Sequence, residues 1–191
     1  LVGPSDGELA GGDSGPGRMV EPEEISAAAL ALCGPRDLDG RRVVISAGGT
    51  REPIDPVRFL GNRSSGRQGA ALAAEACARG AEVTLVAANI SADVMADARH
   101  PSLRVVSVGT AAELGAAMKD AARDADVVIM AAAVADYRPA AVSPHKLTKE
   151  QGALTHLELV ENEDVVAALS VARGEGVAPA GQTIVAFAAE T

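Results

Sequence analysis

The sequence predicts an α/β protein with a doubly wound, Rossmann-like parallel sheet, in which helices cover both faces to give three α/β/α layers. Short β-branched runs alternate along the chain with Ala-rich helical runs. The strand-like runs are apolar throughout rather than alternating, which is typical of a parallel sheet buried on both faces. Aromatic residues make up only 2% of the 191 residues, so we expect a core of Ala, Val, Leu and Ile in closely packed layers.

The first 40 residues are expected to precede the sheet domain. Glycines and prolines through residue 17 predict loop structure. A short helix is expected over residues 21–32, with Pro22 near its start and Gly34-Pro35 ending it. We therefore place a linker at residues 1–40 and the main domain at residues 41–191.

The main domain begins with a predicted strand at residues 42–47 and a glycine loop at Gly48 and Gly49. An insert of about a dozen residues follows, with Arg51, Pro53, Asp55, Pro56 and Arg58 in it, whereas the segment that begins at residues 137–139 is expected to be irregular and basic. A helix is then expected over residues 66–79, with Gly80 ending it.

The remaining elements continue the alternation. Strands are expected at residues 82–87, 103–108, 126–131, 155–160 and 183–188. Helices are expected at residues 111–123, where Thr110 and Glu113 form a capping box, and at residues 162–172. In such folds ligands bind beyond the carboxyl ends of the strands, so the loops there are the candidate site.

Charge and cysteine content exclude several classes of protein. The formal net charge is -9, which leaves no basic surplus for nucleic acid or an acidic membrane surface. Cys33 and Cys77 lack the spacing of metal ligands, and two isolated cysteines do not indicate a disulfide framework. Free thiols of this kind are typical of a protein in the reducing cytoplasm. No apolar run reaches membrane-spanning length, and no basic-then-apolar export signal opens the sequence.

The stretch at residues 62–69 predicts a site for an anion, most simply a phosphate. Ser64, Ser65 and Gly66 stand where a helix begins, so they offer hydroxyls, free backbone N–H groups and the positive end of the helix dipole. The alternative is an ordinary serine N-cap.

Four further residues are candidates with a structural alternative each. Asp136 follows a strand end and could accept a hydrogen bond from a nucleobase amino group or help hold a metal ion, or could cap a turn. Lys146 and Lys149 could reach a triphosphate, or be solvated charges. Phe187 could border a nucleobase, or belong to the core.

A dinucleotide-binding oxidoreductase is the alternative function. Against it, a long insert separates Gly48 and Gly49 from Gly66, and the second strand ends at Asn89 without the expected carboxylate. A catalytically inactive scaffold subunit is a third hypothesis.

Four ordered blocks, residues 46–58, 62–69, 132–138 and 187–191, resemble phosphopantothenate–cysteine ligase over a match from residue 41 to the end. Residues 7–22 are similar to the closing segment of phosphopantothenoylcysteine decarboxylase, a flavin enzyme fused ahead of the ligase in many bacteria. That family usually has a cysteine where Gly11 stands. FMN would belong to the missing part of that domain, so we expect no decarboxylase activity here.

The resemblance implies CTP-dependent amide synthesis in coenzyme A biosynthesis. The carboxylate of 4′-phosphopantothenate would attack the α-phosphate of CTP to give an acyl-cytidylate and pyrophosphate. The amine of L-cysteine would then displace CMP. Mg²⁺ would bridge the triphosphate, with Asp136 as a candidate ligand, and the protein would pair as a homodimer.

The resemblance also implies residue roles. Asn62 and Lys146 would be catalytic, the first holding the acyl-cytidylate oxygens and the second neutralising phosphate charge. The implied nucleotide-binding residues are Gly48, Gly49, Ser64, Ser65, Gly66, Ala132, Ala133, Val134, Ala135, Asp136, Lys146, Lys149 and Phe187. Two departures are noted: Thr148 stands where the family commonly has a lysine, and family members continue through further strands after residue 191.

Overall fold

A computed structural model describes residues 2–96, 98–148 and 155–188. The chain forms two compact units, Leu1–Asp37 and Leu38–Thr191.

The first unit contains a β-hairpin and a helix. Strands β1 (Ser5–Glu8) and β2 (Ser14–Arg18) pair antiparallel, and helix α1 (Pro22–Cys33) follows with Pro22 in its first turn. The helix was predicted, but the prediction of loop for the first 17 residues is wrong. The tight turn between the strands, with Gly12 at φ 83°, brings two segments of low strand propensity together.

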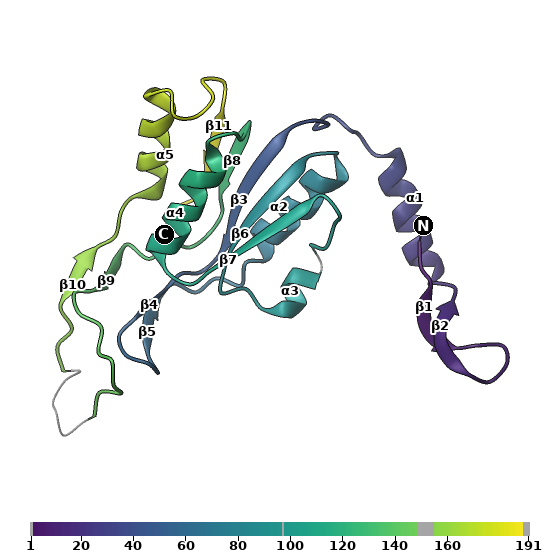
Figure 1. The fold of residues 1–191 in the computed structure, drawn as a ribbon, viewed down its shortest axis with the longest axis horizontal. Helices are drawn as coiled ribbons and strands as arrows, with labels where there is room; N and C mark the ends of the chain where they lie inside the picture. The colour runs from purple at the N-terminus through teal and green to yellow at the C-terminus, as the bar shows by residue number, and fades with distance from the viewer. Residues whose placement is uncertain (1, 97, 149–154, 189–191) are drawn as a thin grey trace. The chain divides into compact units, whose positions relative to one another are not determined.

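The second unit is built on a five-stranded parallel sheet (Figure 1). Its strand order is β11 (Thr183–Ala186), β8 (Val127–Met130), β3 (Arg42–Gly48), β6 (Glu82–Ala88) and β7 (Leu103–Val108). The chain runs outward from the central β3 to β7, then returns to β8 and continues to β11. This order confirms the predicted doubly wound fold and places its topological switch point between β3 and β8.

Helices cover both faces of the sheet, as predicted (Figure 1). Val43 and Ile45 of β3 pack with Cys77 of α2 (Arg67–Ala78), and burial raises the pKa of that thiol. Val44 points to the opposite face, where it packs with Leu114 of α4 (Ala111–Ala122) and with α5 (Val165–Gly174). The alternation along β3 therefore supplies apolar residues to both layers.

Local sequence accounts for details of these helices. The capping box of Thr110 and Glu113 at the start of α4 is confirmed. In α2, a Cβ added at Gly69 would lie 2.4 Å from the Cβ of Ala47, so the glycine lets the helix approach β3 closely. The short helix α3 (Ala92–Ala96), which the sequence analysis did not predict, packs against α2.

Two small hairpins stand beside the sheet. Strand β4 (Arg51–Pro53) pairs with β5 (Phe59–Gly61) inside the insert, where no strand was predicted. Strand β9 (Tyr137–Pro139) pairs with β10 (Leu159–Glu161), where a strand was expected at residues 155–160. The four strands of these hairpins have three residues each, which is too short to show the period of two that identifies a strand. The sequence therefore did not predict β4, β5 or β9, and it predicted β10 with different bounds.

A search of the described residues for a helix long and apolar enough to cross a membrane found none.

Candidate functional site

The loops after β3 and β8 are joined at the switch point. The N–H of Ala133 donates to the oxygen of Gly48 at 2.8 Å, and the N–H of Thr50 donates to the oxygen of Ala133 at 3.2 Å. Gly48 has φ 87°, and a Cβ there would lie 2.0 Å from the oxygen of Ala88. Only glycine fits this position, because both the backbone conformation and the space exclude a side chain.

Buried hydroxyl groups hold the loop that follows β8. The N–H of Ala135 donates to Oγ1 of Thr50 at 2.9 Å, and the N–H of Ala132 donates to Oγ of Ser46 at 3.2 Å. Thr50 and Ser46 are both fully buried. These hydrogen bonds fix the backbone of residues 132–135 at both ends. The sequence analysis assigned no role to either hydroxyl.

Asn62 links the insert to the same loop. Its Nδ2 donates to the oxygen of Val134 at 3.0 Å. A Cβ at Gly49 would lie 2.7 Å from the backbone oxygen of Asn62, so a glycine is required where the two segments meet. The structure therefore brings together three segments that are distant in sequence.

The start of α2 lies next to this junction. Gly66 is the N-cap residue, with φ 79° and no side-chain cap, and a Cβ on it would approach the N of Gly48 to 3.2 Å. The hydroxyls of Ser64 and Ser65 accept only long hydrogen bonds of 3.4 and 3.5 Å from the N–H groups of Gly66 and Arg67. The alternative of a serine N-cap is wrong, and the helix N-terminus presents N–H groups suited to an anion.

A cavity of about 720 Å³ opens beside these loops, at the carboxyl ends of β8 and β11. The predicted residues that line it are Asn62, Ala132, Ala133, Val134, Ala135, Asp136 and Phe187. Asp136 and Phe187 are both exposed, which excludes the core role that Phe187 could have had.

Sequence reasoning missed the opposite wall of the cavity. Asn162, just after β10, donates from its backbone N–H to the oxygen of Asp136 and from Nδ2 to the oxygen of Ala135, both at 2.8 Å. Its Oδ1 accepts from Nη1 of Arg138 at 3.0 Å. A polar Asn-Glu-Asp run at the end of a strand was the available signal, but the sequence analysis used it only to begin α5.

The cavity has an acidic rim made of Asp136, Glu161, Glu163 and Asp164. Glu163 is paired with Nζ of Lys119 at 2.7 Å, and Asp164 caps α5 by accepting from the N–H of Ala167 at 2.9 Å. Among the described residues, no group of three or more His, Cys, Asp or Glu could hold a metal ion. A bound cation would therefore need oxygens from the ligand itself.

The two predicted lysines are placed differently. Lys149 lies outside the described residues. Lys146 is exposed and is not among the described residues that line the cavity. It is next to Leu147, whose N–H donates to the buried carboxylate of Asp55 at 3.1 Å.

Asn89 occupies the position where a dinucleotide-binding protein has a carboxylate. Its Nδ2 donates to the oxygens of Gly49 and Gly109, both at 2.9 Å, and its φ of 51° is left-handed. The amide joins the loops after β3 and β7 and is not available to a ribose. This arrangement argues against the oxidoreductase hypothesis.

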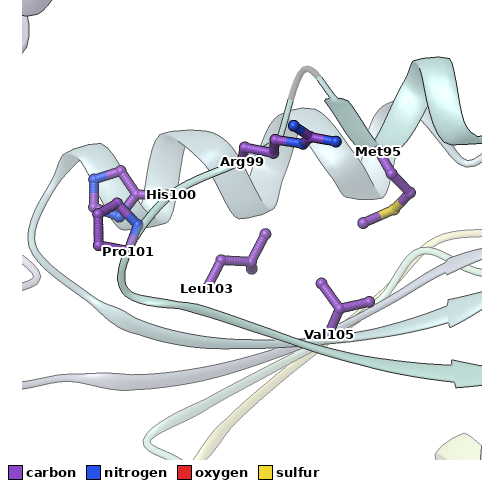
Figure 2. Close-up of a pocket in the computed structure, with 6 residues that line it drawn as sticks. All are labelled: Met95, Arg99, His100, Pro101, Leu103 and Val105. Atoms are coloured by element: carbon purple, nitrogen blue, oxygen red, sulfur yellow. The ribbon is translucent and has the colours of Figure 1, made fainter. Parts of the chain in front are cut away.

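A second hollow, of about 460 Å³, lies at the edge strand β7 (Figure 2). Leu103 and Val105 point toward Met95 of α3, and Arg99 lies over them in Figure 2. None of the predicted site residues lines this hollow. The candidate site is therefore the cavity at the switch point together with the start of α2.

Residues 38–191 match the family model of the DNA/pantothenate metabolism flavoprotein C-terminal domain. The chain belongs to this family. It is 47% identical over 196 residues to the coenzyme A biosynthesis bifunctional protein CoaBC of Mycolicibacterium smegmatis, covering 100% of this chain and 46% of that protein. The chain spans about half the length of the curated relatives it matches.

The fold of the chain is similar to those of solved structures. A crystal structure of the C-terminal domain of a CoaBC protein aligns with a TM-score of 0.64 and 38% identity, covering 81% of this chain and 67% of that one. A complex of a Cab2 mutant with phosphopantothenate-cysteine aligns with a TM-score of 0.56 and 18% identity, covering 78% and 67%. At 18% identity, the similarity to the Cab2 mutant shows a shared fold only.

Proposed function

We propose that the chain is the ligase domain of a coenzyme A biosynthesis protein and joins 4′-phosphopantothenate to L-cysteine at the expense of CTP. The observation that carries this proposal is the convergence of three of the four family-like sequence blocks on one cavity, which Asn62, residues 132–136 and Phe187 line together. Membership of the DNA/pantothenate metabolism flavoprotein C-terminal family and similarity to CoaBC proteins support it. By the same similarity, a flavin-dependent decarboxylase domain would precede this one in a longer protein.

The geometry suggests how the nucleotide would lie. The pyrimidine would lie in the cavity, with its amino group donating to Asp136 and its ring beside Phe187. The phosphates would extend to the N-terminus of α2, away from the acidic rim. This orientation keeps the negative phosphates away from the carboxylates of the acidic rim, which would repel them.

The chemistry needs charge stabilisation and positioning more than a nucleophilic side chain. The Asn62 amide lies at the cavity and would hold an oxygen of the acyl-cytidylate as the amine of cysteine attacks its carbonyl carbon. Lys146 would neutralise phosphate charge while CMP leaves. Mg²⁺, when bound through the phosphate oxygens, would supply further charge neutralisation, with Asp136 as a candidate protein ligand.

A homodimer is part of this proposal. The hairpins β4–β5 and β9–β10 lie side by side and contact each other through β4 and β9 (Figure 1). Both hairpins carry exposed apolar side chains. These are Val57, Phe59, Tyr137, Leu159 and Val160. Exposed apolar residues gathered on neighbouring hairpins are typical of a surface that another chain covers.

Pyrophosphate release tests the function. Release should require CTP, 4′-phosphopantothenate and Mg²⁺ but not cysteine, and CMP should appear only after cysteine is added. Calorimetric titration should give tighter binding of CTP than of ATP in the presence of Mg²⁺. No pyrophosphate release, or NADH binding detected by its fluorescence, would refute the proposal.

A further inference from the structure

The carboxylate of Asp55 closes the turn between β4 and β5, here called the Asp55 turn (residues 54–58). Its side chain is fully buried. Oδ1 accepts from the backbone N–H groups of Val57 and Arg58, both at 2.8 Å. This half of the interaction is local, and an asparagine oxygen could replace it.

The other oxygen of Asp55 reaches a distant part of the chain. Oδ2 accepts from the N–H of Leu147 at 3.1 Å and from the guanidinium of Arg58, whose Nε lies at 2.9 Å. Nη2 of Arg58 also donates to the backbone oxygen of Leu147 at 2.7 Å. Asp55 and Arg58 together therefore bind both backbone polar groups of Leu147. The Arg58 guanidinium also holds the pKa of the Asp55 carboxyl well below its usual range, so Asp55 stays charged.

A second contact holds the same segment four residues earlier. The N–H of Ser143 donates to the oxygen of Ile54 at 3.0 Å. Oγ of Ser143 then donates to the oxygen of His145 at 2.7 Å, which tightens the segment between the two contacts. Residues 143–147, which we call the basic segment, are thus fixed at both ends to the Asp55 turn, with Lys146 between them.

We propose that Asp55 is a positioning residue, which fixes the backbone of the basic segment and so sets where the Lys146 ammonium lies during ligation. This inference rests on the proposed function. A lysine on an unrestrained loop must lose backbone freedom each time it binds a phosphate. Two contacts to a buried turn remove that freedom before the substrate binds, so more of the binding energy is available to the reaction.

Asp55→Asn tests the proposal because it is close in shape and keeps an oxygen for the Asp55 turn. It replaces Oδ2 with an amide that repels the N–H of Leu147 and the guanidinium of Arg58. We expect the Leu147 amide to exchange with solvent at least about tenfold faster, measured by NMR on the ¹⁵N-labelled 191-residue chain. We also expect kcat for ligation to fall about tenfold or more while the Kd for CTP changes by less than about threefold.

Asp126→Asn is the matched control. Asp126 likewise accepts from a backbone N–H, that of Arg42 at 2.8 Å, and from the guanidinium of Arg41, but at the opposite end of the sheet. This variant should speed exchange at Arg42 and leave exchange at Leu147 and kcat unchanged. Arg58→Lys is the second variant, for the case that Asp55→Asn does not fold. It keeps the positive charge, loses the contact to the Leu147 oxygen and should also speed exchange at Leu147.

The possible results separate cleanly. Unchanged exchange at Leu147 in a folded Asp55→Asn chain would overturn the proposal. Faster exchange with an unchanged kcat would also overturn it, because Lys146 would then not depend on the segment's position. A wild-type chain that makes no product would refute the proposed function, and the exchange comparison would still decide whether Asp55 fixes the basic segment.

Discussion

Single polar side chains hold the loops of the candidate site by bonding to the backbone of another segment. The Thr50 hydroxyl accepts from the N–H of Ala135, and the amides of Asn62, Asn89 and Asn162 donate to backbone oxygens of distant loops. The Ala135–Thr50 bond is buried, so removing the Thr50 hydroxyl would leave the Ala135 N–H unpaired at a cost of about 1–3 kcal/mol. The shape of the site therefore depends on a few residues that carry no charge.

Asn62→Asp tests the role of one of these amides. A carboxylate would face the oxygen of Val134 and the phosphate oxygens of an acyl-cytidylate, both of which it repels. We expect the cysteine-dependent step to slow about 100-fold with CTP affinity changed less than tenfold, measured by rapid-quench and calorimetry. Asn62→Ala, which removes the amide without adding charge, should have a smaller effect. Equal effects of the two variants would contradict the repulsion argument.

Asp126 predicts a loss of stability in acid. The N–H of Arg42, with help from the Arg41 guanidinium, lowers the pKa of the Asp126 carboxyl in the folded state. Because the unfolded carboxyl has a pKa of about 3.9, this stabilisation is present above that value and is lost as pH falls through the folded pKa. Urea unfolding at pH 7, 5, 4 and 3 should show a smaller acid loss in Asp126→Asn than in wild type. The control Asp124→Asn removes a neighbouring, well-exposed carboxylate, and its acid loss should match that of wild type.

At the scale of elements, sequence patterns predicted the long strands and helices and missed the short ones. Residues of β3 and β6 form apolar runs long enough to identify, and the capping box identified α4. The hairpins β4–β5 and β9–β10 depend on pairing between segments rather than on local propensity. The same holds for β1–β2, whose glycine-rich strands read as loop.

Packing of α2 on β3 depends on Gly69. Alanine at this position would force its Cβ to within 2.4 Å of the Ala47 Cβ, so the helix would have to move. We expect Gly69→Ala to lower the free energy of unfolding by about 1–3 kcal/mol in thermal or urea denaturation. Gly174→Ala at the end of α5 is the matched control, because nothing lies within 4 Å of its added Cβ, and it should not lower the free energy of unfolding. A neutral Gly69→Ala would show that the layers are looser than the geometry indicates.

At the scale of the whole molecule, the strand order brings together sequence blocks that are far apart. Family resemblance placed Asn62, residues 132–136 and Phe187 in one site, and the structure shows them lining one cavity. Neither pattern nor resemblance indicated Asn162, Thr50 or the contact from Asp55 to Leu147. These depend on which loops meet at the switch point, and only the folded chain determines that.

Self-association is the prediction that belongs to this scale. Replacing Phe59 and Leu159 together by Glu would place charges on the exposed apolar surface of the two hairpins. We expect the sedimentation coefficient to shift from dimer to monomer, with a change in dimer Kd of at least about 100-fold. The control Val177→Glu changes an exposed apolar residue on the loop after α5 and should leave the dimer intact. A wild-type chain that sediments as a monomer at all concentrations would contradict the prediction.

Tyr137 has a practical consequence for studying this protein. It is the sole tyrosine in a chain without tryptophan, and it lines the cavity with a half-exposed ring. Ultraviolet-excited emission near 300 nm therefore comes almost entirely from one ring at the edge of the candidate site. A titrant transparent at the excitation wavelength, such as 4′-phosphopantothenate, can be followed through this intrinsic signal without an added dye or label.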